Sequence, residues 1–392
     1  MSGPLCNLRV IDFTSVLMGP YCTLLLGDMG ADIIKIENAS GDSTRHIGPS
    51  RNKGMGSLFL NLNRNKRSIV LDLKSDEGRK ALLKLVEESD VFIHSLRPQS
   101  IKKLGLAYED VSYVNKQIIY CGMYGFSKEG PYGSKPAYDD IIQAASGIAA
   151  AQGEMTGKPQ YLSSLIADKT AGLLGLSSIL AALYYKEKTG IGQEIEVPMF
   201  ETMVSFNMIE HMYGQTFSPP LGESFYSRAT SPYRKPYQTM NGYVSVLIYN
   251  DKHWKSFFKV SGYEDLGNDG RFKDLNTRVE HIDFVYQTVE QIIATKTTED
   301  WMRILEVADI PCMPVNSPED LFTDVHLQEI EFITDIIHPT EGKIKEVKFP
   351  VSFSATPAGI TKHAPQLGEH NEEVLKEAGY TDEEVKKIVQ QK

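Results

Sequence analysis

The first half of the chain alternates short apolar runs with longer segments of helical periodicity. The predicted strands are Leu8–Phe13, Asp32–Glu37, Ser68–Leu73, Asp90–Ser95 and Ile118–Met123. Helices are predicted at Gly19–Met29, which Gly30 can close, and from Ser75 to Glu88, which begins with acidic residues in its first turn. Apolar strands alternating with helices are typical of a parallel sheet covered by helices, so the expected fold class is α/β.

The pattern changes in the second half. A segment rich in Pro, Ser, Tyr and Arg, at about Phe217–Tyr237, resembles a linker with a site-bearing loop. The following residues predict strands at Tyr243–Ile248 and Ile310–Val315 around helices at His253–Val260, Arg278–Ala294 and Thr298–Val307. We therefore expect a large domain at 1–200, a linker at 201–225, a smaller α+β domain at 226–330, and a return to the large domain at 331–392 through Lys343–Pro350 and the helix Asn371–Ala378.

Composition and charge narrow the function classes. The 392 residues, 41% of them hydrophobic, supply enough apolar surface for two cores. A formal net charge of −10 argues against nucleic acid or an anionic membrane as a partner. The four cysteines lack metal-site or disulfide spacing, so no metal is expected. No signal peptide and no stretch long enough to span a bilayer is recognised, which predicts a cytoplasmic location.

Asp168 is the most informative residue, because it is a lone carboxylate at the start of a long helix of apolar and small residues. One interpretation is an N-cap that accepts hydrogen bonds from the first turn. The other is a nucleophile. Since the helix Ala171–Tyr185 is apolar almost all round, we expect it to be buried, with Ala167, Ala171 and Gly172 leaving room for a ligand to approach Asp168.

Several segments together carry a family resemblance. They are Val10–Thr14 with Gly19-Pro20, Gly30-Ala31 through Ile34–Glu37, Asn65–Lys74, Gly130-Pro131 with Pro136–Asp139, the Asp168 segment, Lys188–Gly190 with Gly192-Gln193, Ile310–Cys312 with Pro314-Val315, and Leu367–His370. In this order and number they resemble the family III CoA-transferases, which include formyl-CoA transferase, carnitine CoA-transferase and the 2-methylacyl-CoA racemases. The resemblance implies a Rossmann-like large domain with a parallel sheet built from both chain ends, a small domain inserted between, and an interlocked homodimer.

The resemblance also implies a chemistry for Asp168. The matching carboxylate attacks the thioester of an acyl-CoA, which gives a mixed anhydride and then an aspartyl-CoA thioester, and an acceptor acid reverses the sequence. Coenzyme A is then a substrate, and no tightly bound cofactor is needed. Carboxylates and thiolates are already nucleophilic near neutral pH, so no deprotonating base is expected. Accordingly, the chain has no Gly-x-Ser-x-Gly elbow.

Coenzyme A needs positive charge for its phosphates and a groove for its pantetheine arm. The run Arg64–Arg67 precedes a predicted strand, and further cations follow later strands, where α/β folds bind ligands. For any one of them a solvated surface charge is the alternative. Family matching favours as CoA-binding residues Val16, Leu17, Met18, Leu71, Lys74, Ser95, Leu96, Arg97, Lys103, Lys135 and Tyr138.

Departures from the family pattern bear on the contacts with coenzyme A and on the type of reaction. Asn38 replaces a common basic residue, and Ser95–Gln99 replaces a common Asn-Phe-Arg-Pro-Gly. Tyr138 stands where a racemase has its histidine base, and a phenol with an ordinary pKa of about 10 suits α-proton exchange poorly. CoA transfer is therefore the favoured activity, with 2-methylacyl-CoA racemisation as the alternative. A nonenzymatic CoA-binding subunit is the third and least favoured interpretation.

The acid that accepts CoA is predicted from the irregular segment Tyr226–Tyr237, which leads into the small domain. Arg228 and Arg234 could clamp a second carboxylate, which favours a small dicarboxylic acid. The alternative is that they solvate the linker or hold a dimer together.

Overall fold

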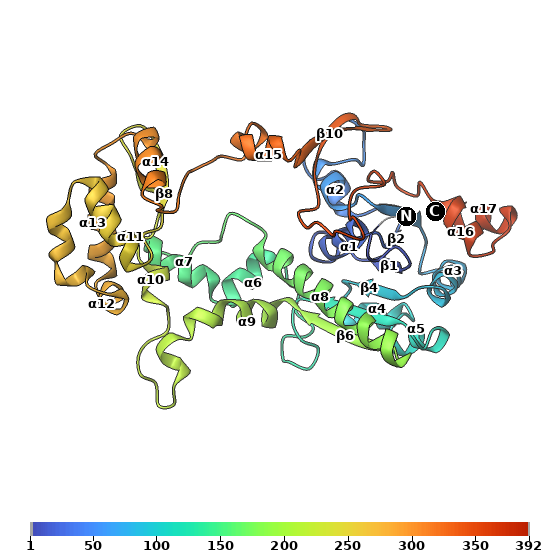
Figure 1. Cartoon of the computed structure of the whole chain (residues 1–392). Coiled ribbons are helices and arrows are strands. Elements are labelled where there is room, and N and C mark those ends of the chain that lie inside the picture. The colour runs from blue at the N-terminus through green and yellow to red at the C-terminus, as the bar shows by residue number, and fades with distance from the viewer. Residues whose placement is uncertain (1–2, 391–392) are drawn as a thin grey trace. The chain divides into compact units, whose positions relative to one another are not determined.

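The computed structural model describes residues 3–390 and separates them into two compact units. Within the described part, unit 1 covers 3–146, 163–205 and 328–390, and unit 2 covers 147–162 and 206–327. The domain boundaries expected from the sequence stay a prediction. Figure 1 colours the chain from its N-terminus to its C-terminus.

Unit 1 is built on one parallel sheet. Its strands are β1 (Arg9–Phe13), β2 (Asp32–Glu37), β3 (Lys66–Val70), β4 (Val91–His94), β5 (Ile119–Tyr124) and β6 (Gln193–Pro198), in the order β3-β2-β1-β4-β5-β6. All neighbouring pairs are parallel, which confirms the α/β fold. The order reverses between β1 and β4, and ligands of doubly wound folds bind at such a switch point.

The sheet differs from its prediction in two respects. Its six strands all come from residues 9–198, so the expectation that both chain ends build the sheet is wrong. The pattern search also missed β6, because this edge strand carries polar residues and is only partly buried. The other five strands lie where the apolar runs predict them, within a few residues.

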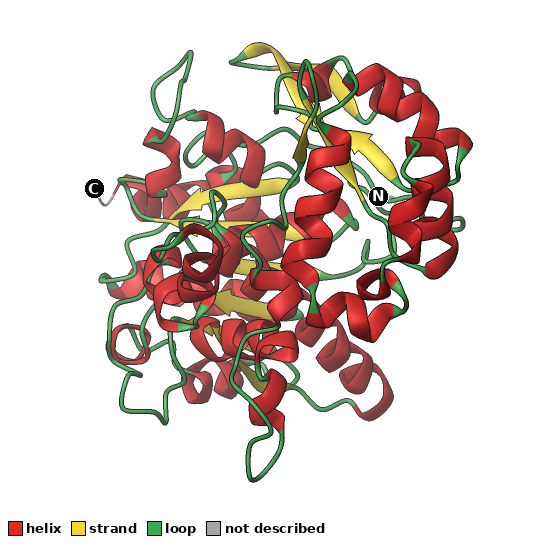
Figure 2. Cartoon of the chain, turned by 90° about the vertical axis from the view of Figure 1, so that its left-hand side faces the viewer, coloured by secondary structure: helices red, strands yellow, loops and turns green. Residues whose placement is uncertain are grey.

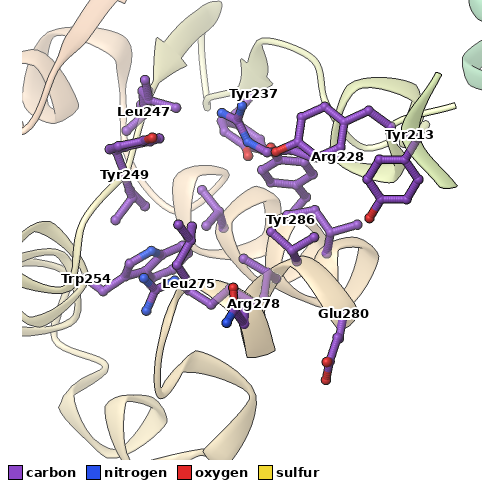
Figure 3. A pocket seen from close by; sticks show the side chains of 18 residues that line it. Tyr213, Arg228, Tyr237, Leu247, Tyr249, Trp254, Leu275, Arg278, Glu280 and Tyr286 are labelled. Carbon is purple, nitrogen blue, oxygen red and sulfur yellow. The ribbon is translucent and has the colours of Figure 1, made fainter. Parts of the chain in front are cut away.

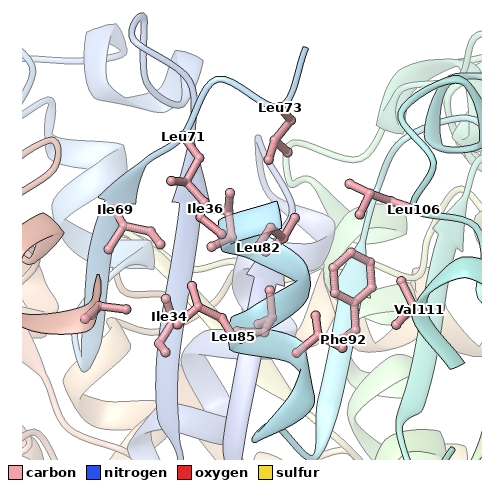
Figure 4. Close-up of a cluster of buried hydrophobic side chains, with 14 of the residues drawn as sticks. Ile34, Ile36, Ile69, Leu71, Leu73, Leu82, Leu85, Phe92, Leu106 and Val111 are labelled. Carbon is pink, nitrogen blue, oxygen red and sulfur yellow. The ribbon is translucent and has the colours of Figure 1, made fainter. Parts of the chain in front are cut away.

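Helices cover the sheet, red around yellow strands in Figure 2. Those of unit 1 are α1 (Met18–Asp28), α2 (Ser57–Leu62), α3 (Asp76–Glu87), α4 (Pro98–Lys103), α5 (Tyr108–Val114), α6 (Asp139–Ala145), α8 (Ile166–Thr189), α16 (Asn371–Glu377) and α17 (Asp382–Gln390), while α9 (Met199–His211) and α15 (Val325–Glu329) cross the unit boundaries. Apolar strand residues pack against Leu82 and Leu85 of α3 in the core shown in Figure 4.

The C-terminal segment joins unit 1 without adding to the parallel sheet. It forms an antiparallel hairpin, β10 (Ile333–His338) with β11 (Gly342–Val347). Val374 and Leu375 of α16 are fully buried in the core beside the sheet. Arg67 of β3 forms ion pairs with Glu373 and Glu377 of α16, which ties the end of the chain to the sheet.

Helix α8 is apolar on all sides but buried on only one. It packs against α1, β5 and β6, with Ala171, Gly172 and Gly175 among its buried residues. A Cβ on Gly172 would lie 2.9 Å from the Met18 carbonyl oxygen, so this small residue permits close helix packing and leaves no room for a ligand. The opposite face exposes Leu173, Leu174 and Tyr184, contrary to the expectation of complete burial.

The expectation that no stretch is long enough to span a bilayer is wrong for helix α8. Its 24 residues are long and apolar enough, by length and composition alone, to cross a bilayer. In unit 1 one side of this helix covers the sheet, as a core helix of a globular protein does.

Unit 2 combines a small antiparallel sheet with helices. The sheet has β7 (Tyr237–Gln238), β8 (Tyr243–Val246) and β9 (Cys312–Pro314), in that order. The helices are α7 (Ile148–Thr156), α10 (Ser227–Thr230), α11 (Asp251–Ser261), α12 (Leu275–Glu280), α13 (Ile282–Ile293) and α14 (Thr298–Val307). An aromatic core around Trp254, Phe257 and Trp301 holds these elements together.

Candidate active site

A pocket of about 200 Å³ opens at the carboxyl ends of β1, β4 and β5, beside the switch point of the sheet. Asp168 lies in its wall, so we call it the Asp168 pocket. The other lining residues are Ser15, Val16, Leu17, Met18, Ser95, Arg97, Pro98, Met123, Tyr124, Gly125, Gly133, Lys135, Pro136, Ala137, Tyr138 and Met199. All of them belong to unit 1.

Buried charges hold the loop after β1 against this pocket. Asp12 accepts hydrogen bonds from Thr14 and Thr23 and pairs with Lys66 at 3.0 Å. Lys35 donates to the Thr14 carbonyl oxygen and pairs with Asp42 at 2.9 Å.

The loop itself is strained at its tip. Val16 has a φ of 69°, which is unusual for a β-branched residue. Its N–H donates to Asp42, and the Ser15 N–H donates to the Ser95 hydroxyl. Because a strained backbone persists only where its surroundings enforce it, these bonds fix the wall formed by Val16, Leu17 and Met18.

Asp168 does not cap its own helix. It is the third residue of α8, and Leu165 at the N-cap position makes no side-chain capping bond. Asp139 supplies the cap instead: its Oδ1 accepts from the Ala167 N–H at 2.8 Å and from the Asp168 N–H at 3.0 Å. The Gln143 side-chain amide donates to the other oxygen of Asp139 at 2.5 Å.

The Asp168 carboxylate is therefore not used to cap the helix. Within residues 3–390 it accepts no hydrogen bond from the protein, although its residue is only 9% exposed. Burial, together with the neighbouring Asp139 carboxylate, raises the pKa of Asp168 to about 7. With this pKa, Asp168 is present in both its ionised and its protonated form near neutral pH.

Sequence comparison agrees with a CoA site. The family described as CoA-transferase family III matches residues 5–371. The chain belongs to this family.

Its relatives share most of their length with it. The succinyl-CoA:mesaconate CoA-transferase of Haloarcula hispanica is 32% identical, covering 96% of this chain and 97% of that protein. The succinate–glutarate CoA-transferase of Agrobacterium fabrum is 33% identical over 95% of both chains. The formyl-CoA:oxalate CoA-transferase of Escherichia coli is 31% identical over 98% of both. The chain is accordingly a CoA-transferase.

Solved structures of the family have the same fold. A CAIB/BAIF family protein from Brucella suis matches with a TM-score of 0.81 and 29% identity, over 96% of this chain and all of that one. A Mycobacterium tuberculosis protein matches with a TM-score of 0.81 and 26% identity, over 94% of this chain and 98% of that one.

The structure gathers many of the CoA-binding residues predicted from the family III resemblance. Lining the Asp168 pocket are Val16, Leu17, Met18, Ser95, Arg97, Lys135 and Tyr138. Leu71 is buried in the core and Leu96 packs against it, while Lys74 and Lys103 are exposed and do not line the pocket. Their contacts with coenzyme A stay a prediction.

The basic run Arg64–Arg67, which leads into the start of β3, has a structural role in this CoA-transferase. Arg64 pairs with Asp28, Lys66 with Asp12, and Arg67 with Asp32. All three cations are buried, so they are neutralised by internal partners and are not presented to phosphates. Sequence alone suggested a phosphate site because it does not show these distant carboxylates.

The histidines give no sign of a racemase base. His94 is buried, and burial lowers its pKa to about 3, with Lys128 adding to the shift. His211 is buried in α9, and its ring nitrogen accepts from the Tyr226 N–H. Tyr138, which the family resemblance predicts to match the racemase histidine, lines the pocket.

Asp139 is the functional residue that the sequence reasoning missed. It belongs to the Pro136–Asp139 segment of the family resemblance, and that membership was the available signal. Its role was hidden because the cap that it supplies joins residues 29 positions apart. Arg228 and Arg234, predicted for the acid substrate, belong to unit 2 and do not line the Asp168 pocket.

Proposed function

We propose that this CoA-transferase moves CoA from an acyl-CoA to a small carboxylic acid through covalent intermediates on Asp168. One observation carries the proposal. The buried Asp168 carboxylate lies in the wall of a pocket that Arg97 and Lys135 also line, and it does not cap α8, because Asp139 supplies the cap.

The first half of the reaction loads CoA onto the enzyme. The Asp168 carboxylate attacks the thioester carbonyl, so a carbon–oxygen bond forms, the carbon–sulfur bond breaks, and CoA leaves as its thiolate. The thiolate then attacks the Asp168 carbonyl of the mixed anhydride. This step gives the aspartyl-CoA thioester and frees the donor acid, which carries away one oxygen of Asp168.

The second half reverses these steps with the acceptor. Its carboxylate attacks the aspartyl thioester, and the released thiolate attacks the acceptor carbonyl of the new anhydride. The new acyl-CoA leaves, and Asp168 is regenerated with one oxygen from the acceptor. Overall, the thioester of the donor is broken and one thioester of the acceptor is formed, and no water or oxidant is consumed.

The raised pKa of Asp168 is consistent with a role as a nucleophile. Burial in a poorly solvated site disfavours its charged form, which makes the ionised carboxylate more reactive than one in water. The cost is that only the ionised fraction attacks. Activity should therefore rise with pH through about 7.

Coenzyme A is proposed to bind along the remaining wall of the pocket. We place the pantetheine arm along Val16, Leu17 and Met18, and the phosphates near the exposed cations Arg97 and Lys135. Both cations lie beyond the ends of sheet strands, where α/β folds bind anionic groups.

The acid substrates are proposed from the relatives. The names of the compared enzymes contain succinate, mesaconate, glutarate and oxalate, all of which are small dicarboxylic acids. A dicarboxylic donor or acceptor is therefore the first choice for this chain. The paired clamp of Arg228 with Arg234 stays a prediction.

We further propose that the enzyme is a cytoplasmic homodimer, interlocked as the family resemblance implies. The exposed apolar face of α8, including Leu173, Leu174 and Tyr184, supports a second copy as its cover. Analytical ultracentrifugation measures the assembly directly: a dimer is expected, and a monomer at micromolar concentration would contradict this part.

Intact-protein mass spectrometry tests the transfer mechanism. After incubation with succinyl-CoA without acceptor, we expect a CoA adduct on the peptide containing Asp168, and none in Asp168→Ala. Exchange of an α-proton for deuterium in a 2-methylacyl-CoA, without an adduct, would support the racemase instead. Absence of both the adduct and the deuterium exchange would support the nonenzymatic CoA-binding subunit.

A further inference from the structure

Unit 2 contains a cavity of about 510 Å³ made entirely from its own residues. This volume lies within the range typical of sites for small organic ligands. Its walls come from the end of β8, from α11, α12 and α13, and from the segment before β7. Figure 3 shows the lining side chains.

One end of the cavity is polar. Figure 3 shows Arg228, Tyr237, Tyr213 and Tyr286 grouped there. The Arg228 guanidinium interacts with the Tyr286 hydroxyl, but no carboxylate among residues 3–390 lies within ion-pair distance of it. Arg228 is partly buried, so it is a cation at the cavity wall that no described carboxylate contacts in an ion pair.

Tyr237 adds a hydrogen-bond donor at the same end. Its residue is 5% exposed, and its side chain lines the cavity. Burial raises the pKa of both Tyr237 and Tyr286, so their hydroxyls keep their protons. A guanidinium and protonated phenols are the groups that bind a carboxylate.

The rest of the wall is mostly apolar. Trp254, Leu275, Val285 and Val289 line it together with Val246, Leu247 and Ile248. Arg278 also lines it, but Asp251 neutralises this arginine at 2.6 Å and the Phe272 carbonyl oxygen accepts from it.

The charges allow only one carboxylate. Arg228 is the single lining cation without a partner carboxylate in the described part of the chain, and Glu280, which turns away from it in Figure 3, would repel a second anion. Arg234 is exposed and does not line the cavity.

We propose that this cavity binds a monocarboxylic acid with an aromatic or branched apolar body, its carboxylate on Arg228 and the hydroxyls of Tyr237 and Tyr286, and its body against Trp254. This site is separate from the Asp168 pocket, and its existence does not depend on the transfer mechanism. It gives unit 2 a ligand of its own, an acid that the enzyme binds without converting it to an acyl-CoA.

Tryptophan fluorescence can test the site directly. The chain has two tryptophans: Trp254 lines the cavity, and the buried Trp301 does not. In Trp301→Phe, fluorescence reports on Trp254 alone. Titration with 3-phenylpropionate should give a saturable change, and the neutral 3-phenylpropionamide should bind about tenfold more weakly or worse, since it cannot pair with a cation. Calorimetry on the unaltered protein gives the same comparison should Trp301→Phe fail to fold.

Matched variants identify the contact. Arg228→Gln should weaken 3-phenylpropionate binding about tenfold or more, whereas Arg303→Gln, which changes an exposed arginine of α14, should leave it unchanged. Asp168→Ala should also bind normally, which separates this site from the catalytic pocket. The proposal is overturned by the absence of saturable binding at millimolar acid, by equal binding to Arg228→Gln, by loss of binding in Asp168→Ala, or by tighter binding of glutarate than of 3-phenylpropionate.

Discussion

Helices α3 and α8 both begin with a carboxylate in the first turn, yet the two carboxylates are in opposite situations. In α3 the helix caps itself: the Ser75 hydroxyl accepts from the Gly78 N–H at 3.0 Å, and Asp76 and Glu77 lie exposed near the positive end of the helix dipole. In α8 the cap comes from Asp139 in α6, and Asp168 is buried beside that second negative charge.

We interpret this difference as one between a structural acid in α3 and the proposed reactive acid in α8. An exposed first-turn acid contributes a few tenths of a kcal/mol and keeps its ordinary chemistry. A buried acid that neither caps its helix nor has a counter-charge costs stability when ionised. Groups with strongly shifted pKa values at pocket walls are typical of functional sites.

The largest expected effect is that of Asp168→Ala, which should reduce CoA transfer by roughly a thousandfold or more because the nucleophile is gone. CoA affinity and the fold should be retained, since Asp139 caps α8 without the help of Asp168. Steady-state kinetics and calorimetry with CoA measure both. Asp76→Ala, at the matching end of α3, should transfer CoA normally. An unfolded Asp168→Ala protein would restore a capping role to this residue.

The same comparison predicts a pH-dependent stability effect. The pKa of Asp168 in the folded chain lies above its ordinary value, so the protonated form favours folding and this stability is lost as the pH rises through about 7. Asp168→Asn should therefore raise the melting temperature at pH 8 more than at pH 5. An equal change at both pH values would show that Asp168 is not perturbed.

Asp139 should separate the roles of cap and charge. Asp139→Ala leaves two helix N–H groups without their acceptor, which should cost about 1–3 kcal/mol of stability and about 100-fold in transfer rate through misplacement of Asp168. Asp139→Asn keeps an acceptor oxygen and removes the charge, so the rise of kcat/KM with pH should move below pH 7. Urea denaturation and pH–rate profiles distinguish the two variants. A profile unchanged in Asp139→Asn would rule out the electrostatic role.

Much of this comparison was accessible from the sequence, and part was not. The strands β1 to β5 and the start of α3 follow from local periodicity and from Ser75, because their signals lie within a few residues of one another. Asp168 was recognisable because a lone carboxylate interrupts a helix of apolar and small residues. Its cap from Asp139 and the ion pairs of Arg64, Lys66 and Arg67 depend on long-range contacts that periodicity does not encode.

A smaller effect is expected in coenzyme binding. Arg97 lines the Asp168 pocket and Lys103 does not, although both were predicted to bind CoA. Arg97→Ala should weaken CoA binding by about 1–3 kcal/mol, and less so at high salt. Calorimetry at two salt concentrations measures this, with Lys80→Ala on the exposed side of α3 as the unchanged control. An equal or larger loss in Lys103→Ala would mean that the phosphates lie beyond the pocket described above.

The smallest effect belongs to the self-capped helix. Ser75→Ala removes the acceptor for Gly78 and should cost about 1 kcal/mol of stability without changing CoA transfer. Chemical denaturation with parallel activity assays measures this. A loss of activity here would mean that disturbing any helix start impairs this enzyme, which would remove the distinction drawn between α3 and α8.

Oxygen tracing tests the central claim most directly, because the mechanism requires each acceptor molecule to leave one of its carboxylate oxygens on Asp168. The enzyme would be turned over with unlabelled succinyl-CoA and glutarate carrying heavy oxygen in its carboxylates, and the peptide containing Asp168 then weighed by mass spectrometry. The account predicts that this peptide gains heavy oxygen while other acidic peptides, such as that containing Asp76 and Glu77, do not. Formation of glutaryl-CoA with no label on the Asp168 peptide would contradict it.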